Sequence, residues 1–399
     1  MKRIVKKKKL DEFIIELQKE ATKVDPSCQH YGKCGGCSMQ NVSYDDQTRI
    51  KFESFKKLIE QEGLEEEFED ANFHLVQSPE QDHYRQRVDL VFDSRAAGFR
   101  RKNSKEVIEL EDCELMRPGA FDVFAKVRSY VREKEFTPYN VLNATGFLRY
   151  FILRQTRDGQ RMLILLTAAH DHAEDIEALA TELIASGELD SFHWLVNSGR
   201  SDVSFGSSYK FWGKEYIYET FLDNDFLLGP NTFFQSNAYV AEKAYSLIKE
   251  DVAKYKPKHL LDLYSGTCTI GIILSKEAES ITAVENIPAN RDLAVENFKN
   301  NDVSNIDYIN DDCELFMKTY EGDPDYVVCN PPRTGVDEKT VRKLNEIRPN
   351  QMAYLACNPK TLLEDLGILT IRYEITDVYV LDMFPQTHHF ETLVFLKKI

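Results

Sequence analysis

The sequence predicts an α/β protein in which a parallel sheet, covered by helices on both faces, follows a domain of α+β type. After residue 240, short apolar strands alternate with helical or loop segments, and this rhythm is typical of parallel sheets buried on both faces. Between residues 84 and 225, short strands follow one another and two helices interrupt them, at about 119–133 and 172–186. That mixture indicates an antiparallel sheet with packed helices.

The length of 399 residues suggests two or three domains, each with its own core. Residues 1–27 are expected to form a basic tail with a short amphipathic helix. Residues 28–225 are assigned to one unit, which begins with a loop rich in Cys and Gly (28–43) and a helix at 44–63. Residues 226–399 form the C-terminal unit, with strands expected at 259–264, 281–285, 306–309, 326–329, 352–356, 371–381 and 390–396.

Composition indicates a cytoplasmic protein. No apolar run approaches the roughly 20 residues that cross a bilayer, and the basic N-terminus lacks the apolar segment of a secretory signal. Without such a signal, the eight cysteines favour metal binding or catalysis over disulfides. No membrane association and no obligate protein partner is expected, and nothing in the pattern demands more than a monomer.

The net charge of −16 weighs against binding to nucleic acid, but the positive charges form two local clusters, one near the N-terminus and one between residues 85 and 105. The second cluster is interleaved with Tyr84, Phe92 and Phe99, and such a composition can bind phosphates through its charges while its aromatic rings stack bases. A solvated basic face is the alternative for both clusters. They consist of Lys2, Arg3, Lys6, Lys7, Lys8 and Lys9, and of Arg85, Arg87, Arg95, Arg100, Arg101, Lys102 and Lys105.

A nucleoside site is predicted at residues 260–271 (LLDLYSGTCTIG), which follow a strand and open a helix. Glu285 ends the next strand 23 positions after Asp262, where a carboxylate can accept both ribose hydroxyls. Cys268 stands where glycine is usual, which weakens the signature. The predicted site can hold an adenosine without binding a pyrophosphate, and S-adenosylmethionine therefore fits it better than NAD.

Asn330 lies at the end of another strand, in CNPPRTG. Two prolines fix the backbone directly after it, which aims its amide into the crevice where open α/β sheets bind ligands. A rigid turn without a ligand is the alternative.

Cys357 ends a further strand and is followed by Asn358-Pro359 and a helix. A cysteine in such a place is often an inert apolar side chain, but this one shares a sheet edge with Glu285 and Asn330. The positive end of the following helix favours the thiolate. Glu391 stands among apolar residues at the start of the last strand, and partial burial raises the pKa of such a carboxyl toward values useful for proton transfer.

Three cysteines are spaced C-x5-C-x2-C, and a fourth stands alone in IELEDCELM. Four thiolates suit either tetrahedral zinc or a [4Fe–4S] cluster, and spacing does not decide between them. Unliganded buried thiols are the third possibility. The four are Cys28, Cys34, Cys37 and Cys113.

These motifs together resemble the RNA uracil-5 methyltransferase family. The resemblance runs from about Cys28 to the C-terminus and is carried in order by CQHYGKCGGC, YRQRV, FFQSN, DLYSGTCTIG, CNPPRTG, ACNPKTL and DMFPQTHHFE. It implies a Rossmann-like class I methyltransferase sheet, mostly parallel with an antiparallel last strand, preceded by an α+β RNA-binding domain with an iron–sulfur loop. The short N-terminus, which lacks a TRAM barrel, and the Asn-Pro-Pro-Arg variant resemble the bacterial 23S rRNA enzymes.

The resemblance implies that Cys357 attacks C6 of a uracil and that Glu391 later removes the C5 proton. It places Gln235, Tyr264, Glu285 and Asn330 at the S-adenosylmethionine site, and Asp312 beside the adenine, although Asp311 replaces the usual glycine. It implies a [4Fe–4S] cluster on the four cysteines. The expected substrate is a loop or extruded uridine of 23S rRNA, with a tRNA loop as the alternative.

Three other readings compete. A radical S-adenosylmethionine enzyme would carry C-x3-C-x2-C, which is absent. A methyltransferase acting on amino groups shares Asn-Pro-Pro but leaves Cys357 and Glu391 unexplained. A catalytically silent RNA-binding or iron–sulfur protein is the third reading, and Cys268 is the feature that keeps it open.

Overall fold

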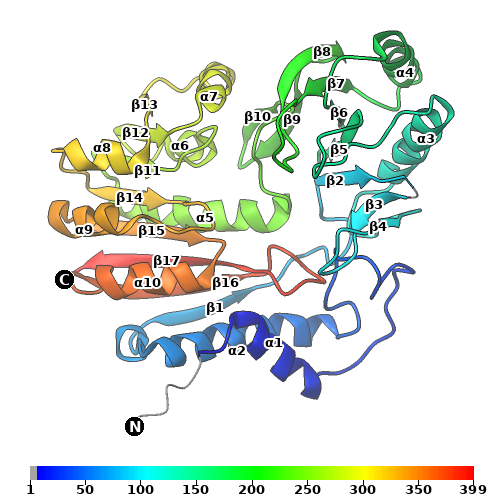
Figure 1. Cartoon of the computed structure of the whole chain (residues 1–399). Helices are drawn as coiled ribbons and strands as arrows, with labels where there is room; N and C mark the ends of the chain where they lie inside the picture. The colour runs from blue at the N-terminus through cyan, green and yellow to red at the C-terminus, as the bar shows by residue number, and fades with distance from the viewer. Residues whose placement is uncertain (1–6, 95) are drawn as a thin grey trace.

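The computed structural model describes residues 7–94 and 96–399 and shows two main sheets (Figure 1). The larger sheet has eight strands, and its outermost strand comes from the N-terminal part of the chain. In order across the sheet they are β1 (Asn72–Val76), β16 (Tyr373–Leu381), β17 (Glu391–Lys398), β15 (Gln351–Ala356), β14 (Tyr326–Cys329), β11 (His259–Leu263), β12 (Ser280–Glu285) and β13 (Ile306–Asn310).

The predicted Rossmann-like sheet is confirmed. β17 runs antiparallel to both of its neighbours, and the other pairs are parallel. Alternate residues of one strand enter different cores, Leu260 on one face and Leu261 on the other, because side chains alternate along a strand. The helices of this unit are α5 (Ala238–Tyr255), α6 (Thr269–Leu274), α7 (Pro288–Asn300), α8 (Cys313–Thr319), α9 (Glu338–Ile347) and α10 (Pro359–Leu369).

The structure divides the range 28–225 that the sequence analysis assigned to one unit. Helix α2 (Tyr44–Glu62) buries Phe55 and Leu58 in the same core as α9 and α10, and β1 pairs with β16. In Figure 1 the blue helices α1 (Leu10–Leu17) and α2 accordingly lie beside the red C-terminal strands. Short 3-10 helices occupy Gln18–Glu20 and Glu66–Phe68. Residues 1–6 of the expected basic tail, with Lys2, Arg3 and Lys6, lie outside the described residues.

The central unit contains a seven-stranded sheet with α3 (Ala120–Glu133) and α4 (Ala173–Ala185) packed against it, close to the expected positions. The pairs are antiparallel except β6 with β7, which α4 connects. A separate hairpin of β9 (Ile217–Phe221) and β10 (Asn224–Leu228) leads to the C-terminal unit. The strand order is β4 (Val107–Glu109), β3 (Ala97–Arg100), β2 (Arg87–Phe92), β5 (Leu148–Gln155), β6 (Arg161–Thr167), β7 (Ser191–Val196) and β8 (Ser207–Gly213).

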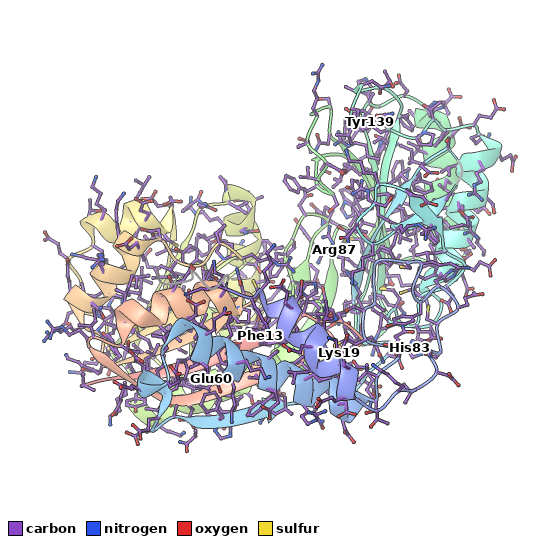
Figure 2. All side chains as sticks on the ribbon, turned by 60° about the horizontal axis from the view of Figure 1, so that its bottom comes forward. Phe13, Lys19, Glu60, His83, Arg87 and Tyr139 are labelled. Atoms are coloured by element: carbon purple, nitrogen blue, oxygen red, sulfur yellow. The ribbon has the colours of Figure 1, made fainter. Side chains whose placement is uncertain are left out.

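Figure 2 shows Phe13 on α1 and Glu60 on α2, the two N-terminal helices beside the C-terminal unit, and Arg87 and Tyr139 in the central unit. The loop 28–43 contacts both units. Its Gly35 amide donates to Arg100 O at 3.0 Å, and the amides of Ser38 and Met39 both donate to Gln386 O at 2.9 Å. None of the helices in the described ranges combines the length and apolar composition that would let it cross a membrane.

Candidate active site

A cavity of about 830 Å³ opens at the C-terminal ends of the parallel strands, where open α/β sheets bind ligands. Both predicted catalytic residues line it, together with every residue that the resemblance placed at the methyl donor. They stand at or near the ends of different elements, so the topology brings together residues that are far apart in sequence. The predicted residues that line it are Gln235, Tyr264, Glu285, Asp312, Asn330, Cys357 and Glu391.

Cys357 and Glu391 meet because β17 is antiparallel. Ala356 at the end of β15 lies opposite Thr392, so the next position of this ladder places Cys357 beside Glu391. A parallel last strand would have put its first residue at the opposite edge of the sheet.

Glu285 is held in position by two backbone amides. Gly266 N donates to its Oε2 at 3.1 Å, and Ile287 N donates to its Oε1 at 2.8 Å. Tyr264 and Gly266 adopt positive φ angles of 61° and 56°, which bends the chain after β11 around the carboxylate. The turn therefore fixes the group predicted to accept the ribose.

Asp262 is a site residue that the sequence analysis used only as a reference position. It lines the cavity and is fully buried. Burial, with a smaller contribution from the charge of Glu285, raises the pKa of Asp262 to about 7, and a hydrogen bond from the Gly271 backbone opposes the shift. The sequence feature that could have identified Asp262 is a carboxylate inside the apolar strand LLDL. Burying an acid is energetically costly, so such a residue indicates a functional position.

Cys268 does not obstruct the cavity. It adopts the left-handed conformation that a glycine would take there, with φ of 60°, and its side chain is fully buried against Ala283, Ala294 and Tyr308. It is absent from the lining. The departure from glycine therefore does not support a silent protein.

Arg333, for which the sequence motifs predicted no catalytic role, also lines the cavity. Its carbonyl accepts a hydrogen bond from Asn358 Nδ2 at 2.9 Å, which ties the turn after β14 to the turn after β15. Its guanidinium opposes the upward shifts of the pKa values of both Cys357 and Glu391. The sequence feature that could have identified Arg333 as a site residue is its position directly after the two prolines.

The pKa of Glu391 is raised to about 7 by burial, as predicted, and Arg333 opposes the shift. The expectation that Cys357 is held as a thiolate is wrong for the protein alone. Burial and then the Glu391 carboxylate raise the pKa of Cys357, and these effects outweigh Arg333 and the backbone hydrogen bond at Cys357. The thiol is therefore protonated near neutral pH, and an adjacent base must accept its proton.

The loop 382–390 that leads into Glu391 is held by the N-terminal part of the chain. Asp382 and Lys51 of α2 form an ion pair whose side chains are both 0% exposed. Lys51 Nζ also donates to Phe384 O at 3.0 Å. His388 N donates to Ser38 Oγ at 3.0 Å. The residues next to the cysteines thus help to position the segment before the proposed base.

The four predicted cysteine ligands, Cys28, Cys34, Cys37 and Cys113, line one cavity. Within the described residues, no group of three or more His, Cys, Asp or Glu side chains is placed to hold a single metal ion. Four cysteine side chains around one cavity are the donor type that both tetrahedral zinc and a [4Fe–4S] cluster use. Gly36 N donates to Cys34 Sγ at 3.3 Å and Gln40 Nε2 donates to Cys37 Sγ at 3.4 Å, contacts that stabilise bound thiolates. The donor set therefore fits a [4Fe–4S] cluster.

Two of the three aromatic residues expected to stack bases in the second basic cluster are buried. Tyr84 is 1% exposed and donates its hydroxyl to Pro385 O, and Phe92 ends β2 with its side chain in the core, whereas Phe99 is partly buried. Arg87, Arg100 and Arg101 form ion pairs with Asp89, Asp202 and Glu106. Arg95 lies outside the described residues.

Comparison with known proteins assigns the chain to a family. A family model described as tRNA (Uracil-5-)-methyltransferase matches residues 210–399. The tRNA (uracil(54)-C(5))-methyltransferase of Pyrococcus abyssi is 30% identical over 92% of this chain and 85% of its own. An uncharacterized RNA methyltransferase of Clostridium acetobutylicum is 32% identical, over 98% and 87% of the two chains.

A solved structure agrees in fold. The crystal structure of the Pyrococcus abyssi tRNA (uracil-54, C5)-methyltransferase in complex with S-adenosyl-L-homocysteine has a TM-score of 0.77, at 28% identity over 92% of this chain and 86% of that one. Together with the cavity that gathers Cys357 and Glu391 at the sheet edge, the comparisons show that the chain belongs to the S-adenosylmethionine-dependent RNA uracil-5 methyltransferase family.

Proposed function

We propose that the protein methylates carbon 5 of a uridine in a tRNA loop, with Cys357 as nucleophile and Glu391 as proton acceptor. The observation that carries the proposal is the placement of Cys357, Glu391 and Arg333 in one cavity with the residues of the predicted donor site. S-adenosylmethionine supplies an electrophilic methyl group. Glu285 and Asn330 line the part of the cavity where the adenosine is expected.

The Cys357 thiol gives its proton to an adjacent base and its sulfur forms a bond to C6 of the uracil. Carbon 5 then carries the electron density that attacks the methyl carbon, and the bond from that carbon to the donor sulfur breaks, which releases S-adenosylhomocysteine. Carbon 5 of uracil is otherwise a poor nucleophile, so the covalent step is what makes methylation feasible. Glu391 accepts the C5 proton, the C5–C6 double bond re-forms and the sulfur leaves. A carboxyl with a pKa of about 7 is suited to this transfer near neutral pH.

The names of the relatives support tRNA rather than the 23S rRNA that the subgroup motifs suggested. The relatives with a named substrate in the comparison are tRNA uracil-54 methyltransferases. A uridine in a tRNA loop also has a lower cost of extrusion than one in a regular duplex.

The test is methylation of unmodified RNA by the purified protein. tRNA and 23S rRNA from a strain lacking this gene are each incubated with S-adenosylmethionine, and 5-methyluridine is mapped by mass spectrometry. We expect one loop position of tRNA to be modified, and Cys357→Ala to abolish the product. Modification of 23S rRNA alone would replace the tRNA assignment.

We also propose that Cys28, Cys34, Cys37 and Cys113 hold a [4Fe–4S] cluster with a structural role, because the methyl transfer moves no electrons between metal and substrate. The support is their shared cavity and the hydrogen bonds to two of the sulfurs. Anaerobic purification should give about four iron and four sulfide per chain. Cys37→Ala should lose iron, whereas Cys313→Ala, a buried cysteine outside the cavity, should keep it. Stoichiometric zinc without iron would reject the cluster.

A further inference from the structure

Two phenylalanine rings are strongly exposed, one in the lining of the active-site cavity and one on a loop hydrogen-bonded to the segment that carries the first. Phe233 is 70% exposed and lines the cavity, and Phe205 is 59% exposed on the β7–β8 loop (residues 197–206). No aromatic or cationic side chain among the described residues contacts the Phe205 ring. An exposed aromatic ring needs a reason when the backbone that carries it is rigid.

The β7–β8 loop is rigid because a buried arginine binds its carbonyls. Arg149 Nη1 donates to Asn197 O at 2.6 Å and to Gly199 O at 2.7 Å, and Nη2 donates to Ser201 O. The same guanidinium lies 4.4 Å from the centre of the Tyr139 ring. The loop is therefore fixed before any partner binds, which lowers the entropy lost on binding.

Hydrogen bonds on both sides of Phe205 hold its backbone and connect it to the segment that carries Phe233. Asn197 Nδ2 donates to Phe205 O at 2.8 Å. The Asn231 amide pairs with Gly206, donating to its carbonyl at 2.8 Å and accepting from its N–H at 3.3 Å. Asn231 is two residues before Phe233, so the two exposed rings stand on directly bonded segments.

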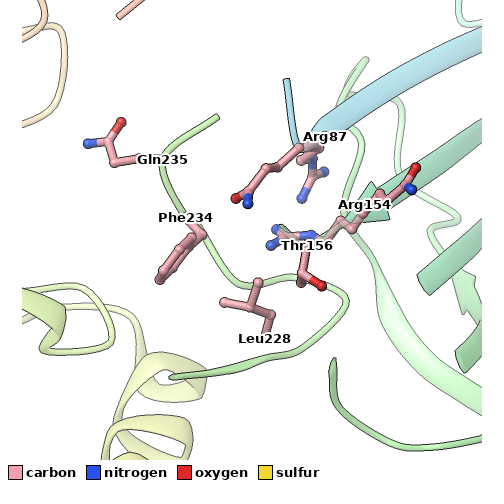
Figure 3. A pocket seen from close by; sticks show the side chains of 8 residues that line it. Arg87, Arg154, Thr156, Leu228, Phe234 and Gln235 are labelled. Atoms are coloured by element: carbon pink, nitrogen blue, oxygen red, sulfur yellow. The ribbon is translucent and has the colours of Figure 1, made fainter. Parts of the chain in front are cut away.

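Arginine side chains contact these segments. Arg87, which is paired with Asp89, donates to Ser204 Oγ at 3.5 Å, and Arg154 donates to Thr232 O. Figure 3 shows both arginines beside Phe234, whereas Gln235 points away from them. Arg154 is 3% exposed, its Nε has no hydrogen-bond partner, and it forms no ion pair with any carboxylate of the described chain. Arg200 adds an exposed cation on the loop itself.

We propose that Phe205 is a stacking platform for the RNA base next to the target uridine. This rests on the proposed function: the target base enters the cavity beside Phe233, and the adjacent base of the same strand stacks on Phe205. Exposed aromatic rings combined with excess positive charge are the pattern that binds single-stranded nucleic acid. The phosphate backbone favours this charge, which an apolar protein partner would not match.

The test uses the full-length protein and a short single-stranded RNA that contains one uridine and 2-aminopurine immediately beside it. Wild type should quench the 2-aminopurine fluorescence on binding, because stacking on an aromatic ring quenches it. Phe205→Ala should lose the quenching and weaken binding about 5-fold to 100-fold, the range expected for one stacked base. Phe205→Trp should retain both.

Phe211→Ala is the matched control, because Phe211 is also exposed in the central unit but lies on β8 rather than on the loop. It should behave as wild type. Equal loss in Phe211→Ala, or wild-type quenching and affinity in Phe205→Ala, would overturn the proposal. If wild type forms no 5-methyluridine, the proposed function fails instead, and the fluorescence result still decides whether Phe205 stacks a base.

Discussion

Gln47 and Gln386 exchange two buried hydrogen bonds across 339 positions of sequence. Gln386 N donates to Gln47 Oε1 at 2.9 Å, and Gln47 Nε2 donates to Gln386 Oε1 at 2.9 Å. Gln386 has a φ of 67°, a conformation that non-glycine residues adopt only when neighbours impose it. Through this pair, helix α2 sets the path of the loop that ends at Glu391.

Replacing Gln47 should therefore impair catalysis without affecting the donor site. Gln47→Leu leaves the Gln386 amide buried without an acceptor, at a cost of about 1–3 kcal/mol of stability. We expect kcat to fall at least about tenfold, as a small misplacement of a catalytic group can cause, while S-adenosylmethionine affinity by calorimetry stays unchanged. Gln61→Leu, on the same helix but hydrogen-bonded only to Lys8, is the control. A loss of stability with unchanged kcat would show that the pair is merely structural.

Glu391→Gln should trap the covalent intermediate. The amide cannot accept the C5 proton, so methylated RNA stays bonded to Cys357. A protein–RNA band that survives denaturing electrophoresis is expected for Glu391→Gln and not for the double variant that also carries Cys357→Ala. Turnover of Glu391→Gln at the wild-type rate would assign the proton to another base.

Glu391 should also make the fold less stable at high pH. Its pKa is about 7 in the folded protein, above the ordinary value of 4.5, so its contribution to stability is fully present below pH 4.5 and is lost as pH rises from there through 7. Glu391→Gln should match wild type near pH 4 and exceed it at pH 8 by up to about 3 kcal/mol. Urea denaturation at the two pH values measures this difference. A constant difference would contradict the raised pKa.

The single-turnover methylation rate should rise with pH between 6 and 9, because both Cys357 and Glu391 act without their protons and both pKa values are raised. Arg333 opposes both shifts, and Tyr245 also faces Glu391. Arg333→Gln should therefore displace the profile to higher pH and lower the rate at pH 7. Arg342→Gln, an exposed arginine of α9, should leave the profile unchanged. If the pH–rate profile of Arg333→Gln is not shifted, Arg333 does not lower the pKa values of Cys357 and Glu391.

Cys268→Gly should leave donor binding unchanged. The residue already has the conformation of a glycine, which costs other residues about 1–2 kcal/mol, and its buried side chain lies outside the cavity lining. Calorimetry with S-adenosylmethionine should give the wild-type affinity within about twofold, corresponding to about 0.4 kcal/mol. Gly266→Ala, at φ of 56° in the cavity wall, should weaken binding and serves as the contrast.

The sequence by itself determined the alternation of strands and helices after residue 240 and the strand ends that carry Glu285, Asn330 and Cys357. These follow from local periodicity and turn chemistry, because a residue's place at a strand end depends on its neighbours in the chain. The pairing of β1 with β16 did not follow, because β1 is a short, partly exposed edge strand without an apolar run. Its place is decided by the sheet it joins.

Tertiary structure alone decided which side chains share an environment. It placed Glu391 beside Cys357 through an antiparallel pairing, buried Asp262 fully, and put Tyr84 in the core. It also reversed the expected charge state of Cys357, because burial and the Glu391 carboxylate raise its pKa. Burial and the field of neighbouring charges depend on residues that are distant along the chain, and these determine the pKa values at this site.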